Sequence, residues 1–177
     1  MADPVGDLWT ALDEANRSRA RLYVEFFRAI EARLGRGAAI EICKDAIRNW
    51  GRGLASGLEN HRPNDFYGLT KSFALMPDGG AMFCPRVDRC DETGLDIGFE
   101  RCPLQIAWRE AGFSDSDSEL FCNIACEADY GTLEAAGFDV EIESWKAGRS
   151  GCCRLSIRPR RQKQTPMAVP EKQTDSC

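Results

Sequence analysis

The spacing of apolar residues changes near residue 77, and this change constrains the fold more than any other feature. Before it, apolar residues recur every three or four positions, as along residues 22–34, which is the period of an amphipathic helix. After it, apolar and polar residues alternate along residues 95–101, which indicates a strand with one buried face. The chain therefore predicts a helical part over residues 1–76 and a mixed part over residues 77–158.

The boundaries of the predicted elements follow from turn residues and capping residues. Helices are predicted over residues 5–34 and 38–59, and a short third helix from an N-cap at Asn64 to about Leu75. The mixed part predicts a hairpin, two helices and a second hairpin: Met82–Cys90 with Leu95–Arg101, a helix opening at Pro103, a helix from Asp115 or Ser116 to about Ala128, and residues 138–146 with 152–158. This order predicts an α+β fold, with N-terminal helices and an antiparallel sheet of two hairpins covered by helices.

Length and charge limit the partners that we expect. The chain has 177 residues, which predicts a single domain over residues 1–158 followed by a disordered polar tail over residues 159–177. Its net charge of −5 and its single basic run, residues 158–163, argue against a nucleic-acid partner. We find neither a bilayer-length apolar segment nor a signal peptide, so we expect no membrane partner and a cytoplasmic location. Homo-oligomerisation stays open.

The nine cysteines are the main chemical signal. Their number is odd, and without an export signal we expect thiol chemistry or metal binding rather than a disulfide framework. Cys102 lies at a strand-to-helix junction, where a helix N-terminus lowers a thiol pKa. Cys126 and Asp129 are three residues apart at a helix end, and Cys153 lies near the start of the last strand. We expect folding to gather these four side chains around one small cavity.

Two mechanisms remain open for this set. In the first, a cysteine thiolate attacks an electrophilic carbon and Asp129 moves protons or orients an amidine. In the second, Cys126, Cys153 and either Asp129 or Cys102 bind Zn²⁺, which activates water. The chain has no paired CxxC knuckles, so the alternatives for a cofactor are none or zinc.

The roles of three basic side chains are predicted separately from that of the cysteine set. Arg101 and Arg109 flank the helix that begins near Cys102, and either guanidinium can bind a substrate carboxylate. The alternative for both is a solvated surface position. His61 is the single histidine, and it lies in a polar loop. A Ser-His-Asp hydrolase would depend on it entirely, and the chain lacks the G-x-S-x-G motif.

The stretch from Phe99 to Ile157 resembles the L-2-amino-thiazoline-4-carboxylic acid hydrolase family. The matching segments are residues 102–112, residues 126–129, and Gly148 followed by residues 153–155. The resemblance implies a small-molecule substrate of sulfur metabolism, a cyclic isothiourea whose ring is opened by water. It also implies a carboxylate that holds the amidinium and an arginine that holds the substrate carboxylate. Related rings such as thiohydantoins remain open.

Two features keep other interpretations open. Cys122 and Cys152 are extra cysteines relative to the family pattern, so the residue that acts as nucleophile or ligand is not fixed. The closing glycine turn and cysteine strand are also similar to those of 4-vinyl reductase sensor domains. That similarity implies the alternative of a small-molecule or zinc-binding sensor without catalysis.

Overall fold

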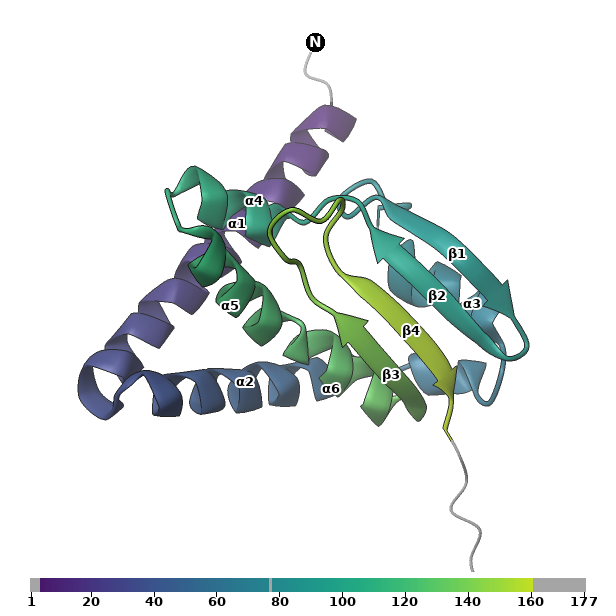
Figure 1. Cartoon of the computed structure of the whole chain (residues 1–177). Coiled ribbons are helices and arrows are strands. Elements are labelled where there is room, and N and C mark those ends of the chain that lie inside the picture. Colours follow the sequence, from purple (N-terminus) through teal and green to yellow (C-terminus); the bar gives the residue numbers. More distant parts are fainter. Residues whose placement is uncertain (1–3, 77, 161–177) are drawn as a thin grey trace, which may run out of the picture.

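A computed structural model describes residues 4–76 and 78–160 of the chain. Helices α1 and α2 form the N-terminal part, and a four-stranded antiparallel sheet with the helices α3 to α6 forms the rest (Figure 1). The α+β fold predicted from the sequence is confirmed. The predicted tail lies almost entirely outside the described residues. Pro159 still belongs to the last strand and pairs with Phe138, one residue beyond the predicted boundary.

The long helices α1 (Pro4–Leu34) and α2 (Arg36–Arg52) meet at a sharp corner. Gly35 makes the corner with a φ of 83°, a conformation that glycine adopts without the steric penalty of a Cβ. The predicted second helix was too long, since α2 ends at Arg52 and not at residue 59. The glycines at its end weaken the helix, and Leu58–His61 forms a separate 3₁₀ turn, η1.

The third helix differs from the prediction at its start and in its geometry. Helix α3 (Phe66–Leu69) has Asp65 as its N-cap, and not Asn64, because the Asp65 carboxylate accepts a hydrogen bond from the Gly68 N–H at 2.9 Å. The chain continues as a π-helical turn, η2 (Thr70–Ala74). Such turns insert an extra residue into the helical hydrogen-bond pattern and change the direction of the side chains.

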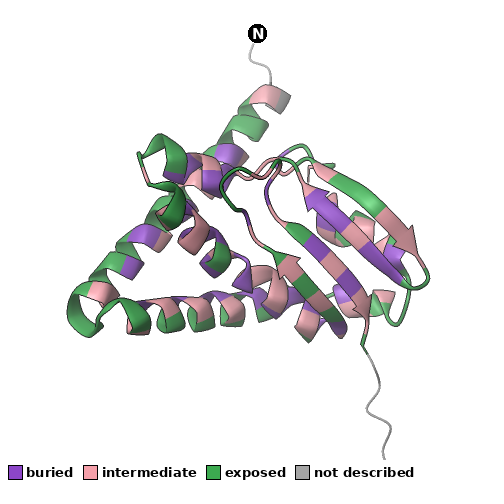
Figure 2. Ribbon diagram, in the orientation of Figure 1, coloured by how far each residue is buried: buried purple, intermediate pink, exposed green. Residues whose placement is uncertain are grey.

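The sheet has the strand order β1-β2-β4-β3, so the two predicted hairpins lie side by side. Its strands are β1 (Pro85–Asp91), β2 (Gly94–Phe99), β3 (Phe138–Glu143) and β4 (Arg154–Pro159). The central strands join the hairpins through Leu95 opposite Ile157 and Ile97 opposite Leu155, and all four side chains are buried. Figure 2 shows this burial along β2 and β4, and Figure 1 places α3 and α6 behind the sheet. One face of the sheet therefore packs on helices.

The chain between the two hairpins contains a helix break that the sequence did not reveal. Helix α4 (Pro103–Glu110) begins at Pro103 as predicted, and α5 (Asp115–Ala125) follows it. The prediction of one continuous helix to about Ala128 was wrong, because Cys126 separates α5 from a further helix, α6 (Glu127–Ala135). The break turns α6 toward α2 and the sheet.

Helices α2 and α6 cross with their backbones in direct contact. A Cβ built on Gly51 would lie 2.2 Å from the carbonyl oxygen of Ala128, and one on Gly131 would lie 2.1 Å from that of Arg48. The Thr132 hydroxyl donates to the Gly51 carbonyl at 2.9 Å across the same crossing. The position of α6 is therefore set by backbone atoms of α2.

We expect Gly51→Ala to lower the free energy of unfolding by about 1–3 kcal/mol, because one of the two helices must shift to admit the methyl group. Gly37→Ala is the matched control, since it lies in the same helix with open space around its Cα. Urea unfolding followed by circular dichroism measures both. Equal unfolding midpoints for Gly51→Ala and Gly37→Ala would contradict the proposed tight crossing.

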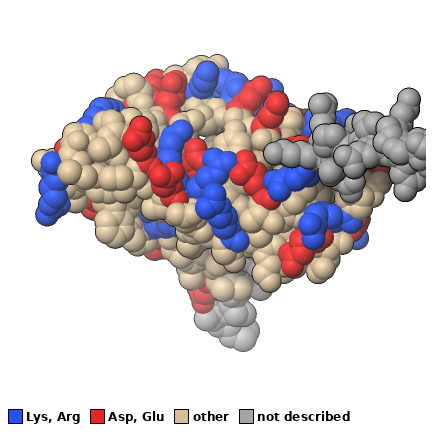
Figure 3. Space-filling view, turned by 90° about the horizontal axis from the view of Figure 1, so that it is seen from below, with Lys and Arg blue, Asp and Glu red and all other residues tan. Residues whose placement is uncertain are grey.

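The surface carries charges of both signs in alternation. Figure 3 shows basic and acidic side chains mixed on the face seen from below. Many of them pair, as in Arg48 with Glu127 at 2.9 Å and with Glu134 at 2.6 Å. Within residues 4–76 and 78–160, no helix has the length and the apolar character needed to cross a membrane.

Candidate functional site

A cavity of about 530 Å³ lies where two apolar cores meet. The first core packs α1, α2, α4 and α5 together, and the second packs the sheet against α6, α3 and η1. Five cysteines and two acids line this cavity. One acid is Asp78, and the other groups come from four separate segments of the chain: Cys102, Cys122, Cys126, Asp129, Cys152 and Cys153. The four residues that the sequence suggested as catalytic or metal-binding are thus brought to one cavity, together with the two extra cysteines.

The closest contact in the cavity is a pair of thiols. The Sγ atoms of Cys126 and Cys153 lie 3.4 Å apart, which joins the break between α5 and α6 to the segment that leads into β4. The hydrogen bond from Cys126 lowers the pKa of the Cys153 thiol, although burial acts in the opposite direction. The same hydrogen bond and burial raise the pKa of Cys126. The two opposite pKa shifts make Cys153 the thiol of the pair that ionises more readily, with Cys126 as its hydrogen-bond donor.

Asp129 reaches the same cavity from the first turn of α6. Burial raises its pKa from 3.8 to about 6, and the positive charge of Arg19 partly offsets this effect. Tyr23 is close enough for the Asp129 charge to contribute to the raised pKa of its hydroxyl. A carboxyl group with a pKa near 6 can both release and accept a proton at neutral pH.

Cys102 differs from the prediction made for it. It is the N-cap residue of α4, and the N–H groups of Gln105 and Leu104 do act to lower its pKa. Burial is the larger effect, and it raises the pKa of the thiol to about 12. The expected activation by the helix N-terminus is therefore wrong, because the thiol is removed from water. Burial also raises the pKa of Cys122, and it raises that of Cys152 to about 11.

The same residues fit a metal ion poorly. In the described part of the chain, no group of three or more His, Cys, Asp or Glu side chains is placed to hold one. Tetrahedral zinc needs three or four converging ligands. We therefore assign no chemical step to zinc.

Neither arginine that flanks Cys102 lines the cavity. The Arg101 guanidinium pairs with Asp13 at 2.6 Å and donates to the Met82 carbonyl at 2.7 Å. Arg109 lies over the ring of Trp145 at 5.6 Å, with about half of its side chain exposed. Their predicted role in binding substrate does not match these positions.

Arg19 lines the cavity instead, although the sequence predicted no role for it. Its guanidinium lies 5.3 Å from the centre of the Trp50 ring, and Nη2 donates to Asn16 at 3.0 Å. The Nε atom is buried without a hydrogen-bond partner. The usable signal was its spacing of four from Tyr23, which places both on one face of α1. That face lines the cavity only because α2 folds against it.

His61 forms a chain of hydrogen bonds that the loop sequence did not predict. Its Nδ1 lies 2.7 Å from the Asp65 carboxylate, and its Nε2 lies 3.0 Å from the Ser72 hydroxyl at the rim of the cavity. A Ser-His-Asp triad relies on a buried carboxylate, whereas the Asp65 side chain is 54% exposed. Asp65 also caps α3. We assign this chain of contacts to holding η1, α3 and η2 together.

The chain matches a known protein family over the residues that form the cavity. The sequence model of the L-2-amino-thiazoline-4-carboxylic acid hydrolase family matches residues 15–155, which is most of the chain and includes every cavity residue named above. The chain belongs to this family. The match begins far before Phe99 and includes Arg19, most of α1 and all of α2. No curated protein sequence matches the chain.

A solved structure shares the fold. The chain is similar to the crystal structure of a trafficking protein particle complex subunit 3 from Naegleria fowleri covalently bound to palmitic acid, with 16% identity and a TM-score of 0.55. The match covers 83% of this chain and 96% of that one. At this identity the likeness shows the fold of this thiazoline-hydrolase family member. Its chemistry has to be inferred from the residues of the site.

Proposed function

We propose that this protein is a hydrolase that opens a small cyclic isothiourea or a related thio-heterocycle carrying a carboxylate, with 2-amino-thiazoline-4-carboxylate as the first candidate. The observation that carries the proposal is the Cys126–Cys153 thiol pair beside Asp129 in one cavity. The family supports the reaction class. The volume of about 530 Å³ lies within the range of small-molecule sites.

Cys153 is the nucleophile in this proposal. Its thiolate is stabilised by the hydrogen bond from Cys126, and half-burial keeps it accessible from the cavity. We place Cys153 ahead of Cys126 in this role, because their hydrogen bond lowers the pKa of Cys153 and raises that of Cys126. Cys126 positions the nucleophile and holds the proton that the pair retains.

The reaction balances with water as the only other reactant. The Cys153 sulfur bonds to the ring carbon between N and S, and the bond from that carbon to the ring sulfur breaks. A proton from Asp129 goes to the departing sulfur. Water then adds to the same carbon, Asp129 takes its proton back, and the bond to Cys153 breaks. The product is a urea with a free thiol, and Cys153 returns as a thiolate.

Arg19 and Asp129 orient the ring in this site. A carboxylate can bind side-on to the unpartnered Nε and the adjacent amino group of Arg19. The carbonyl oxygen of the protonated Asp129 carboxyl group can accept a hydrogen bond from the protonated amidine. We propose Arg19 for the role that the sequence suggested for Arg101 and Arg109.

Incubation of the purified chain with 2-amino-thiazoline-4-carboxylate and with a thiohydantoin tests the proposal, with and without a chelator. We expect one new thiol for each thiazoline ring opened, detected with a thiol reagent, and ring opening of the thiohydantoin is followed by mass spectrometry. Arg19→Gln is expected to raise KM by about tenfold or more with a smaller effect on kcat. Ser72→Ala is the matched control at the rim of the same cavity. If Ser72→Ala lost turnover while Cys153→Ser kept full turnover, Ser72 would be the nucleophile and our assignment would be overturned.

A second candidate is a binding module that holds a small molecule without turnover. It is supported by the trafficking-complex subunit of similar fold, whose structure is described as covalently bound to palmitic acid. The same incubation separates the two functions. Saturable binding of the heterocycle without ring opening, unaffected by chelator, would favour the binding module, and loss of binding with chelator would favour a metal-dependent sensor.

A further inference from the structure

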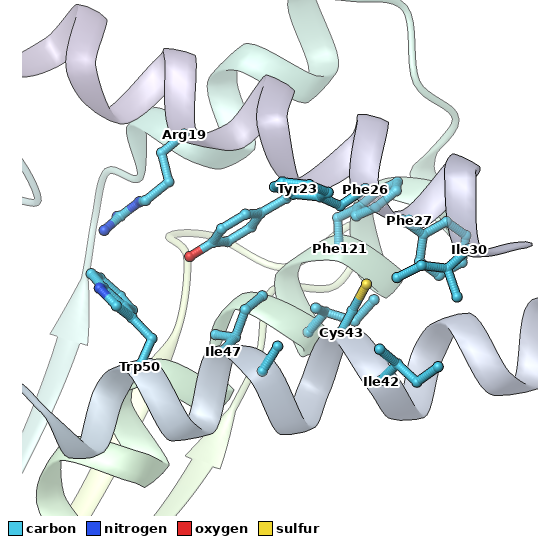
Figure 4. Close-up of a pocket in the computed structure, with 12 residues that line it drawn as sticks. Arg19, Tyr23, Phe26, Phe27, Ile30, Ile42, Cys43, Ile47, Trp50 and Phe121 are labelled. Carbon is cyan, nitrogen blue, oxygen red and sulfur yellow. The ribbon is translucent and has the colours of Figure 1, made fainter.

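A second cavity, of about 490 Å³, lies between α1 and α2. Figure 4 shows its walls, with Phe26, Phe27 and Ile30 from α1 facing Ile42 and Cys43 from α2. Apart from Arg19 and Tyr23 at one end, the walls are apolar: Phe26, Phe27, Ile30, Ile42, Cys43, Ala46, Ile47, Trp50, Phe121 and Ile124. This cavity therefore suits a group without hydrogen-bonding atoms.

The apolar cavity adjoins the cysteine cavity. Arg19, Tyr23 and Trp50 line both. In Figure 4 the Tyr23 hydroxyl points toward the end occupied by Arg19 and Trp50, and its ring extends back along the apolar walls. A molecule whose carboxylate binds Arg19 therefore has the reactive thiols on one side of that contact and the apolar walls on the other.

The rim of the apolar cavity exposes large side chains to solvent. Phe26 is 58% exposed, Trp50 is 45% exposed and Ile42 is 41% exposed, whereas Phe27, Ile47 and Phe121 deeper in the cavity are buried. Removing an exposed apolar rim from water is favourable, and such concave patches mark binding sites.

We propose that the apolar cavity is a subsite for an alkyl or aryl arm of a carboxylate-bearing ligand, with Arg19 binding the carboxylate at the junction. The inference rests on the proposed function for the identity of the reacting ring, and it extends the candidate substrates to carboxylate-bearing heterocycles that carry such an arm. The arm lies between α1 and α2 while the ring lies among the cysteines.

Alkyl carboxylates without a ring test the subsite independently of catalysis. We expect calorimetric titration of the full chain with butyrate, hexanoate and octanoate to give a dissociation constant that falls with chain length, by up to about fourfold for each buried methylene. Ala46→Trp is the key variant, because Ala46 is an exposed residue of α2 that lines only the apolar cavity. We expect this variant to bind butyrate as the unmodified chain does and to lose the dependence on chain length.

Ala29→Trp is the matched control, because Ala29 is an exposed alanine of α1 that lines neither cavity. It should keep the full dependence on chain length. A dissociation constant independent of chain length in the unmodified chain would overturn the inference, and so would an unchanged dependence in Ala46→Trp. Failure of the hydrolase proposal has a different signature, since rings would then stay closed while the alkyl carboxylates still bind.

Discussion

Cys153→Ser is expected to lower kcat/KM for ring opening by at least about 10³-fold while the fold is retained, because the reactive thiolate is lost and a hydroxyl of much higher pKa replaces it. The two side chains are nearly the same size, so the neighbouring packing changes little. Cys152→Ser is the matched control, since the adjacent thiol lines the same cavity with its pKa raised to about 11. Steady-state kinetics and circular dichroism on both variants provide the measurement.

Alkylation rates test which thiol of the pair is ionised. We expect iodoacetamide to label Cys153 before Cys126 and the other buried cysteines, because the hydrogen bond from Cys126 lowers the pKa of Cys153. Cys126→Ala removes that donor and should shift the pH dependence of Cys153 labelling to higher pH. If peptide mapping finds Cys126 labelled first, the two roles are reversed.

Asp129→Asn is expected to lower kcat by about 10²-fold or more and to increase stability at pH 8. Burial raises the pKa of Asp129 in the folded protein from 3.8 to about 6, so folding favours the protonated form. Its stabilising contribution is complete below pH 3.8 and is lost as the pH rises through about 6. Above that range the buried charge costs up to about 3 kcal/mol, and the amide removes this cost.

Urea unfolding at pH 5 and pH 8 measures the stability difference between the two proteins. The gain from Asp129→Asn should be large at pH 8 and small at low pH, where the carboxyl is already protonated. Asp45→Asn, an exposed change on α2, is the control and should show no such pH dependence. A variant that is less stable than the parent at pH 8 would show that the Asp129 charge is stabilised by its surroundings.

Local patterns in the sequence were sufficient to predict the architecture of helices and strands. The change of period near residue 77 and the alternation around Leu95 and Ile97 predict the helices and the central strand, since both reflect contacts made within each element. The helix break at Cys126 was missed because its residues are compatible with a continuous helix. The break is stabilised by the later packing of α6 on α2, which local spacing does not record.

The site was predicted less completely than the fold. Gathering of Cys102, Cys126, Asp129 and Cys153 at one cavity followed from motif order, and the structure places them there. The chemistry of Cys102 was wrong because the degree of burial depends on elements distant in sequence. Arg19 was missed for the same reason. An arginine on a long helix is expected to lie on the surface unless the helix that packs against it is known.

The direct backbone contact between α2 and α6 fixes the acid of the site to the N-terminal helices. Asp129 lies on α6, and the crossing leaves no room for even a methyl group between the two backbones, so its backbone position is tied to that of α2. Cys153 is carried by a different segment, the loop over residues 144–153 that leads into β4. Substitutions in that loop can therefore change the distance from sulfur to acid while the acid stays in register with the α2 wall of the apolar cavity.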